Sequence, residues 1–255
     1  MFGQAMMMGA SGGLAFDPST ALVWLDPSDL STLWQDTAGT IPVTADGQPV
    51  ARINNKGTAG GFFSQGGASY RPLYKASGGL HWLQADGSND CLNVASRFAL
   101  GADPDLTVVV GLMILANKTA DDRFWVLGGP KPTTCLAGAC GSDGWSWRYN
   151  GGALLFGASD IGVSHVGTWR RGAGDLYGDA RFFLDGAEKL VVTSVNPGLA
   201  PSSTSAYCGI HGESAQSAGN PGNHRIYGVI LMNADDDAKQ AAAEEWMATK
   251  AGVAL

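Results

Sequence analysis

Short apolar or alternating segments recur along nearly the whole chain, and clusters of turn residues separate them. The clearest example lies between residues 164 and 195, where Arg-Phe-Phe-Leu precedes Asp185-Gly186 and another apolar run follows. This arrangement predicts a β-hairpin, because a type I′ turn requires positive φ at both central residues. A hairpin cannot bury two faces by itself, so the pattern predicts more sheet packed against it.

Similar segments elsewhere predict further strands. They are residues 21–25, 50–53, 70–74, 80–85, 91–94, 106–115, 124–127, 145–149, 154–156, 206–211 and 225–232. Residues 106–115 are the most apolar and are rich in β-branched side chains, which is typical of a central strand buried on both faces. We expect residues 124–127 to be its neighbour. The glycine-rich residues 57–67 and 128–144 are predicted to be loops.

Only at the C-terminal end does the spacing of hydrophobic residues change from that of a strand to that of a helix. Asn233 is a suitable helix cap, and the acidic residues that follow it suit a first helical turn, where the helix dipole favours anions. Ala238, Ala242 and Trp246 recur at four-residue spacing along one face. The pattern predicts one helix over about residues 235–250.

Composition agrees with an all-β domain. The chain has 37 glycines among 255 residues, which is about twice the usual frequency and indicates many tight turns. The net charge of −7 and the lack of a basic run argue against nucleic-acid binding. There is no apolar run long enough to span a membrane and no basic start of a signal peptide, so we expect synthesis in the cytoplasm.

Residues 1–20 differ from the rest, since they are small, flexible and rich in methionine. We interpret them as an N-terminal arm that is either disordered or docks on a partner, and we favour docking. Methionine adapts to irregular apolar surfaces. The candidate assembly residues are Phe2, Met6, Met7 and Met8.

Three stretches resemble the concanavalin A-like, or laminin-G-like, jelly roll. They are the hairpin region 164–186, the strand and helix at 228–230 and 244–252, and the strand end at 84–92. The resemblance implies an all-β fold: a two-sheet antiparallel jelly-roll sandwich over residues 21–255, with the arm before it and one C-terminal helix.

A narrower resemblance covers residues 25–36, 42–50 and 70–72, which look like structural proteins of tailed phages and prophages. It implies a non-enzymatic virion protein, a decoration or adhesion module on the capsid or tail that is made in the host cytoplasm. Its expected partners are other virion proteins and further copies of itself. The alternative function is a carbohydrate-binding module that contacts glycans of the host surface.

The sequence predicts no enzyme and no catalytic residues. Glycoside hydrolases of the resembled fold carry Glu-x-Asp-x-x-Glu on one strand, which aims two carboxylates at one glycosidic bond, and this chain lacks that run. The histidines, His81, His165, His211 and His224, have no metal-ligand spacing, and there is no Gly-x-Ser-x-Gly motif.

One aromatic group is a candidate glycan surface. Trp145, Trp147 and Tyr149 alternate along a predicted strand, so all three share one face. Exposed aromatic rings stack on sugars. The competing interpretation places these rings in the core of the sandwich.

A calcium ion is the one cofactor that we consider. Laminin-G-like domains often hold calcium at a loop rim, and Asp86, Asn89 and Asp90 offer hard oxygen ligands within one turn. In the alternative, these side chains bond the local backbone as an Asx turn. The four cysteines are either free thiols or include a Cys135–Cys140 disulfide.

Overall fold

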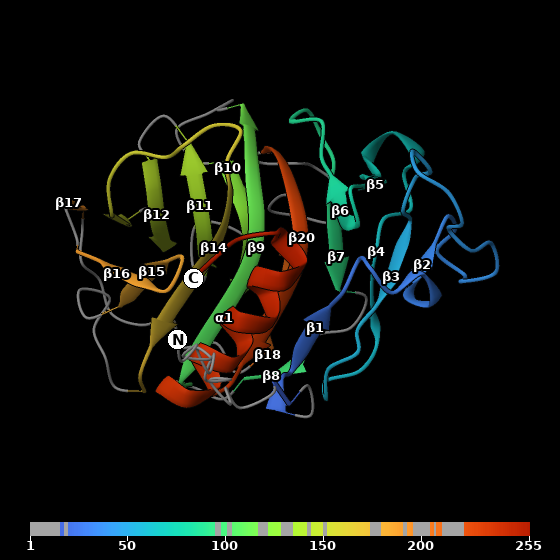
Figure 1. Cartoon of the computed structure of the whole chain (residues 1–255). Coiled ribbons are helices and arrows are strands. Elements are labelled where there is room, and N and C mark those ends of the chain that lie inside the picture. The colour runs from blue at the N-terminus through green and yellow to red at the C-terminus, as the bar shows by residue number, and fades with distance from the viewer. Residues whose placement is uncertain are drawn as a thin grey trace, which may run out of the picture.

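In the computed structural model, two antiparallel sheets pack against each other and a single helix lies on the outside (Figure 1). The structure describes residues 16–17, 20–94, 98–100, 104–116, 122–128, 135–141, 144–149, 152–173, 180–190, 193–195, 205–206, 208–210 and 222–255. Within them the predicted fold class is confirmed: a β-sandwich with one C-terminal helix.

The first sheet, sheet A, contains eight of the described strands. Its order is β16 (Ala187–Lys189), β15 (Arg181–Leu184), β14 (Ser164–Arg171), β9 (Leu106–Ala116), β20 (Asn223–Met232), β6 (Leu80–Gln84) and β5 (Leu73–Ser77), with β1 (Val23–Leu25) also paired to β20. Strands β6 and β1 share one edge of β20, because β6 pairs with its beginning and β1 with its end. The long strands β9, β14 and β20 form the centre of this sheet.

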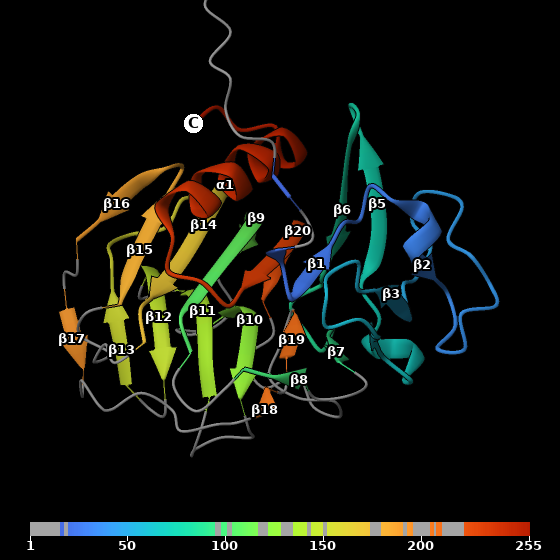
Figure 2. The same ribbon diagram turned by 90° about the horizontal axis from the view of Figure 1, so that it is seen from below.

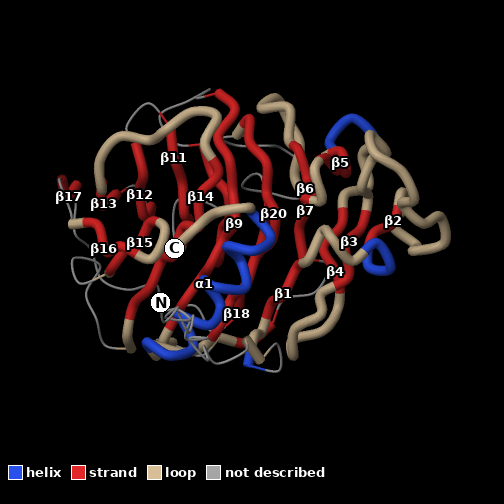
Figure 3. Tube along the Cα trace, in the orientation of Figure 1, coloured by secondary structure: helices blue, strands red, loops and turns tan. Residues whose placement is uncertain are grey.

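The second sheet, sheet B, contains ten described strands. Its order is β17 (Thr193–Val195), β13 (Gly152–Leu155), β12 (Gly144–Tyr149), β11 (Cys135–Gly141), β10 (Asp122–Gly128), β19 (Cys208–Ile210), β7 (Leu92–Val94), β4 (Phe62–Ser64), β3 (Arg52–Asn54) and β2 (Leu33–Trp34). A separate pair joins β18 (Ser205–Ala206) to β8 (Phe98–Ala99), and two 3-10 turns, η2 (Leu30–Thr32) and η3 (Ala68–Tyr70), connect strands near the N-terminal end. Figure 3 shows how strands dominate the described chain.

Aromatic side chains hold the two sheets together. Trp169 on sheet A is fully buried, and its ring lies 5.0 Å from that of Phe182 and 5.9 Å from that of Trp125 on sheet B. The Trp169 Nε1–H donates a hydrogen bond of 3.0 Å to the carbonyl of Ser146 in β12, so one side chain links the sheets by packing and by a polar bond. Rings of this size contribute much of the apolar area that a sandwich buries.

Strand β9 is apolar on both faces, as predicted. Val108, Val110 and Leu112 belong to the core between the sheets, whereas Val109 packs on the opposite face in a cluster with residues of the helix. The prediction that residues 124–127 pair with β9 is wrong. They lie in β10, which pairs with β11 and β19 of sheet B.

Helix α1 (Asp237–Ala251) lies across the outer face of sheet A (Figure 2). Its cap is Asp236, whose carboxylate accepts a 3.0 Å hydrogen bond from the backbone N–H of Lys239, and not Asn233 as predicted. The reason is that β20 continues to Met232, so residues 233–236 are needed to turn from the sheet onto its face. Gly252, which has a φ of 68°, caps the C-terminal end of the helix.

The buried face of α1 differs from the prediction in part. Ala242 is buried and Trp246 is half-buried, as predicted, but Ala238 is exposed. Gln240, Ala243, Glu244 and Met247 are also buried. Met247 fills a trough above two glycines that stand opposite each other, Gly111 in β9 and Gly228 in β20. A Cβ added to Gly111 would lie 2.8 Å from the Met247 sulfur. The glycines therefore allow the helix to approach the sheet closely.

The predicted hairpin is present between β15 and β16. Asp185 and Gly186 have φ values of 51° and 74°, as a type I′ turn requires. Two predicted loops contain strands instead: β4 lies within residues 57–67, and β11 lies within residues 128–144. In β11, glycine makes room for indole rings, since a Cβ on Gly138 would lie 2.1 Å from Trp125 Nε1.

Strand β11 also excludes the disulfide considered above. Cys135 and Cys140 begin and nearly end this one extended strand. The Cα atoms of residues five apart in a strand are separated by roughly 16 Å, far beyond the Cα separation that a disulfide allows. Within the described residues, no helix has the length and apolar character needed to cross a membrane.

Candidate functional site

The predicted glycan platform is wrong for its two tryptophans. Trp145 and Trp147 are 2% and 0% exposed and lie in the core between the sheets. Trp145 packs against Phe124, and Trp147 packs edge-on against Trp125. The alternation of β12 does put both indoles on one face, but that face is the inner one, so neither can stack on a sugar. The side chain of Tyr149 lies outside the described part.

The predicted calcium turn adopts the contacts of an Asx turn. The Asp86 carboxylate accepts a 2.7 Å hydrogen bond from the N–H of Ser88, and the Asp90 carboxylate accepts one of 2.9 Å from the N–H of Asp86. Asn89 contributes its backbone N–H, 3.4 Å from the Asp86 carboxylate. Among the side chains that the structure describes, no three His, Cys, Asp or Glu residues gather as metal ligands. Calcium binding at this turn stays a prediction.

Asp90 is an acid whose ionisation opposes folding. Its side chain is buried, and burial raises the pKa of the carboxyl from 3.8 to about 6. An acid with a raised pKa in the folded state destabilises the fold as the pH rises through the interval between the two pKa values. We therefore expect the stability of Asp90→Asn relative to the wild type to increase by up to about 3 kcal/mol between pH 4 and pH 7.

Urea unfolding curves of both proteins, measured in EDTA at several pH values, check this expectation. Asp86→Asn is the matched control, because Asp86 lies in the same turn but its side chain is exposed. A stability difference that does not change with pH would contradict the burial of a charged Asp90. Repeating the curves with calcium tests the predicted metal site, since bound calcium must stabilise the wild type more than Asp90→Asn.

The predicted assembly residues Phe2, Met6, Met7 and Met8 lie outside the described residues. The first residue that the structure describes is Phe16, and its ring packs on the outside of the molecule. The ring centroid is 6.1 Å from that of Trp24 in β1 and 5.9 Å from that of Trp246 in α1. The two indoles are themselves 5.7 Å apart. We call Phe16, Trp24 and Trp246 the outer aromatic cluster.

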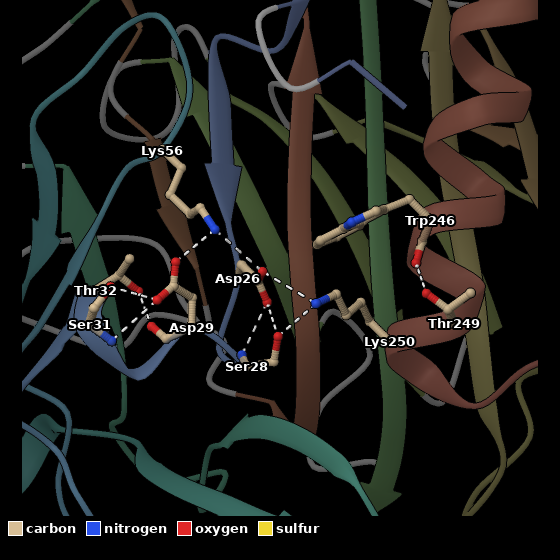
Figure 4. Close-up of polar contacts among 9 residues, drawn as sticks. All are labelled: Asp26, Ser28, Asp29, Ser31, Thr32, Lys56, Trp246, Thr249 and Lys250. Carbon is tan, nitrogen blue, oxygen red and sulfur yellow. Dashed lines mark hydrogen bonds and ion pairs between the residues drawn. The ribbon is translucent and has the colours of Figure 1, made fainter. Parts of the chain in front are cut away.

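Two lysines flank this cluster, each lying over an indole ring. Lys56 Nζ is 4.1 Å from the centre of the Trp24 ring, and Lys250 Nζ is 4.8 Å from that of Trp246. Both ammonium groups also approach Asp26, at 3.6 and 3.3 Å (Figure 4). Cation–π contacts and ion pairs therefore act on the same two side chains.

Asp26 lies at the centre of the polar contacts beside the outer aromatic cluster. It is 4% exposed, and its carboxylate also accepts hydrogen bonds from the hydroxyl of Ser28 at 2.6 Å and from the N–H of Ser28 at 3.1 Å. Asp29 pairs with Lys56 at 2.7 Å, and this contact lowers the pKa of Asp29. These bonds connect the turn after β1 to the end of α1, which fixes the helix beside the outer aromatic cluster.

Next to the cluster lies a groove of about 310 Å³ between the N-terminal segment and the first turns of α1. Its lining residues are Phe16, Asp17, Thr20, Asp236, Ala238, Lys239 and Ala242. Phe16 supplies an aromatic wall that belongs to both features. The Asp17 carbonyl accepts a 2.7 Å hydrogen bond from the Thr20 hydroxyl, which positions these two polar residues at the rim. The groove thus combines one aromatic ring with several hydrogen-bonding groups.

One sequence pattern could have indicated the outer aromatic cluster. In Val23-Trp24-Leu25, alternation places Val23 and Leu25 in the core and turns Trp24 outward. A tryptophan on the outer face of a sheet indicates that another segment of the protein packs against that face. The groove itself had no sequence signal, because its two walls come from opposite ends of the chain.

No protein-family model and no curated protein matches this chain. Solved structures do. A Trypanosoma rangeli sialidase, solved in complex with 2,3-difluoro-KDN, is 10% identical over 90% of this chain and 33% of its own length, with a TM-score of 0.55. The chain therefore spans about a third of that enzyme.

Two shorter proteins match comparably. Domain 4 of AbnA, a GH43 extracellular arabinanase from Geobacillus stearothermophilus solved with arabinotriose, is 15% identical over 89% of this chain and 99% of that domain, with a TM-score of 0.52. The binding domain of botulinum neurotoxin serotype G is 9% identical over 89% of this chain and 51% of its own, with a TM-score of 0.53. At these identities, the likeness shows that the chain shares their β-sandwich fold.

Proposed function

We propose that this chain is a non-catalytic carbohydrate-binding module. The observation that carries the proposal is the match to domain 4 of the arabinanase, which covers nearly all of that domain and most of this chain. That domain was solved with arabinotriose. This chain thus corresponds in extent to one complete sugar-bound domain, whereas it corresponds to only a third of the sialidase.

The groove beside α1 suits such a ligand. Sugar sites combine an aromatic ring, which packs on the C–H face of a sugar, with a few polar groups that bond its hydroxyls. Phe16 supplies the ring, and Asp17, Thr20 and Lys239 supply donors and acceptors. The volume lies at the lower end of the range for small-molecule sites, which favours a short oligosaccharide or the end of a longer chain.

The state of Asp236 in the groove favours binding over hydrolysis. A glycosidase needs one carboxyl that stays protonated to serve as the acid. Asp236 is instead held ionised, because the N–H of Lys239 bonds its carboxylate and lowers its pKa. Its bond to the helix backbone also leaves it little freedom to transfer a proton.

Filling the groove is expected to weaken binding at least tenfold. Ala238→Trp places a large ring in the groove, and this exposed position tolerates a larger side chain without repacking the core. Ala241→Trp is the matched control, because Ala241 is exposed on the same helix and does not line the groove. An array of neutral and sialylated glycans identifies a ligand, and calorimetry then compares the wild type with both variants.

Each outcome bears on a different part of the proposal. Saturable binding that only Ala238→Trp weakens supports both the function and the site. Equal loss in the two variants contradicts the groove as the site. No saturable binding to any glycan on the array contradicts the function.

A role in a phage virion is a second, finer proposal. We propose that the sugar in that case belongs to the surface of the host cell. None of the solved structures named above comes from a phage, so the virion role, the virion location and self-association rest on the sequence resemblance alone.

A further inference from the structure

His165, at the start of β14, forms a hydrogen bond to a carboxylate through one of its two ring nitrogens. The side chain is 6% exposed, and its Nδ1 lies 2.7 Å from Oδ2 of Asp185. Asp185 is rigid, since its other oxygen accepts the N–H of Val166 at 2.8 Å and its own N–H donates to the Val166 carbonyl at 2.9 Å. This pairing favours the imidazole form that carries its proton on Nδ1, which leaves a lone pair on Nε2.

The other ring nitrogen has no hydrogen-bond partner although it is buried. His165 Nε2 lies 3.8 Å from Oδ2 of Asp160, which is too long for a hydrogen bond. Buried polar atoms are normally satisfied, so an exception needs an explanation. The position of Asp160 is defined, because its loop is tied at both ends: the Trp145 N–H donates to the carbonyl of Gly157, and the Gly162 N–H donates to the carbonyl of Ile114.

We propose that His165 Nε2 and the Asp160 carboxylate bind a divalent transition-metal ion of the Zn²⁺ class, with Asp185 orienting the imidazole. Nitrogen and oxygen ligands each lie about 2.0–2.2 Å from zinc, so at a tetrahedral angle they are roughly 3.4 Å apart. The observed gap of 3.8 Å closes with a small rotation of the Asp160 side chain, which is 68% exposed and free to adjust.

The kinds of ligand select the kind of ion. An imidazole with one carboxylate suits zinc, nickel or copper, whereas calcium and magnesium prefer oxygen ligands alone. A histidine that binds metal usually donates its other N–H to a carboxylate or carbonyl, as His165 does to Asp185. With two protein ligands, the remaining positions belong to water. The site is therefore open, and its binding is weak compared with that of a closed structural zinc site.

This inference does not depend on sugar binding. The site lies at the junction between the loop that enters β14 and the β15–β16 turn, and none of its residues lines the groove beside α1. An ion here would fasten that loop to the hairpin and raise the melting temperature of the protein.

Zinc titration of the full chain by calorimetry tests the site. We expect one saturable zinc ion in the wild type. We expect at least tenfold weaker binding in Asp160→Asn, ten- to hundredfold weaker binding in Asp185→Asn, and none in His165→Asn. His81→Asn is the matched control, because a hydroxyl, that of Tyr74 at 2.6 Å, takes the place at its Nδ1 that the Asp185 carboxylate has at His165. The His81→Asn variant must bind zinc with the affinity of the wild type.

Nitrogen-15 NMR of the imidazole ring gives a second readout. Zinc bound at this site must shift the Nε2 resonance of His165. The site would be overturned by an Nε2 resonance that zinc does not move, or by zinc binding of unchanged strength in Asp160→Asn. That variant changes an exposed loop side chain, so its result does not depend on whether His165→Asn folds.

Discussion

Trp169→Ala is expected to lower the free energy of unfolding by about 3–5 kcal/mol. Trp169 is fully buried, contacts Phe124, Trp125 and Phe182, and donates the hydrogen bond that crosses from sheet A to sheet B. Alanine would leave a cavity between the sheets and would remove the hydrogen bond to the Ser146 carbonyl. Both effects weaken the contact between sheet A and sheet B.

Chemical unfolding of the wild type and the variant measures this loss. Trp246→Ala is the matched control, since it deletes the same side chain from the half-buried outer aromatic cluster. Its loss is expected to be clearly smaller, because less area is removed from the interior. Equal losses in the two variants would contradict an aromatic core between the sheets.

The second large effect concerns the contact between α1 and sheet A. Met247→Ala is expected to cost about 2–5 kcal/mol, because Met247 is fully buried in the trough above Gly111 and Gly228. Gly111→Ala in the wild type is expected to cost about 1–3 kcal/mol, since its Cβ would press against the Met247 sulfur. Gly111 has no positive φ, so the cost is one of space and not of backbone strain.

The effects of Met247→Ala and Gly111→Ala on stability are expected to be coupled. In the Met247→Ala background, the added methyl group enters the space that the methionine leaves, so Gly111→Ala becomes neutral or stabilising. The double-mutant cycle should show a coupling energy above about 1 kcal/mol. Gly66→Ala serves as the control, because nothing lies near its Cβ position. Simple additivity would contradict the trough.

Much of the fold could be predicted from sequence because local rules agreed with the final packing. The Asp185-Gly186 turn requires a conformation that few residues adopt, and β9 needs an apolar surface on both sides because a sheet and a helix cover it. Strand β11 escaped prediction for a physical reason. Its small residues resemble those of a loop, yet Gly138 is small because the indoles of Trp125 and Trp169 occupy the space where its side chain would lie.

The candidate site was harder to predict. Alternation correctly places Trp145 and Trp147 on one face of β12, but it cannot say whether that face is inner or outer. The groove joins Phe16 to the start of α1, and local patterns hold no information about contacts between distant segments. The position of the outer aromatic cluster follows only once β1 is placed beside β20 in sheet A.

The groove between the N-terminal segment and α1 is the proposed carbohydrate site. Backbone NMR spectra recorded during titration with arabinotriose and with the best glycan from the array can locate the ligand. We expect saturable shifts that concentrate on the amides of Asp17, Thr20, Ala238 and Lys239. Shifts that concentrate on another surface, or spectra unchanged by every glycan tested, would contradict this proposal.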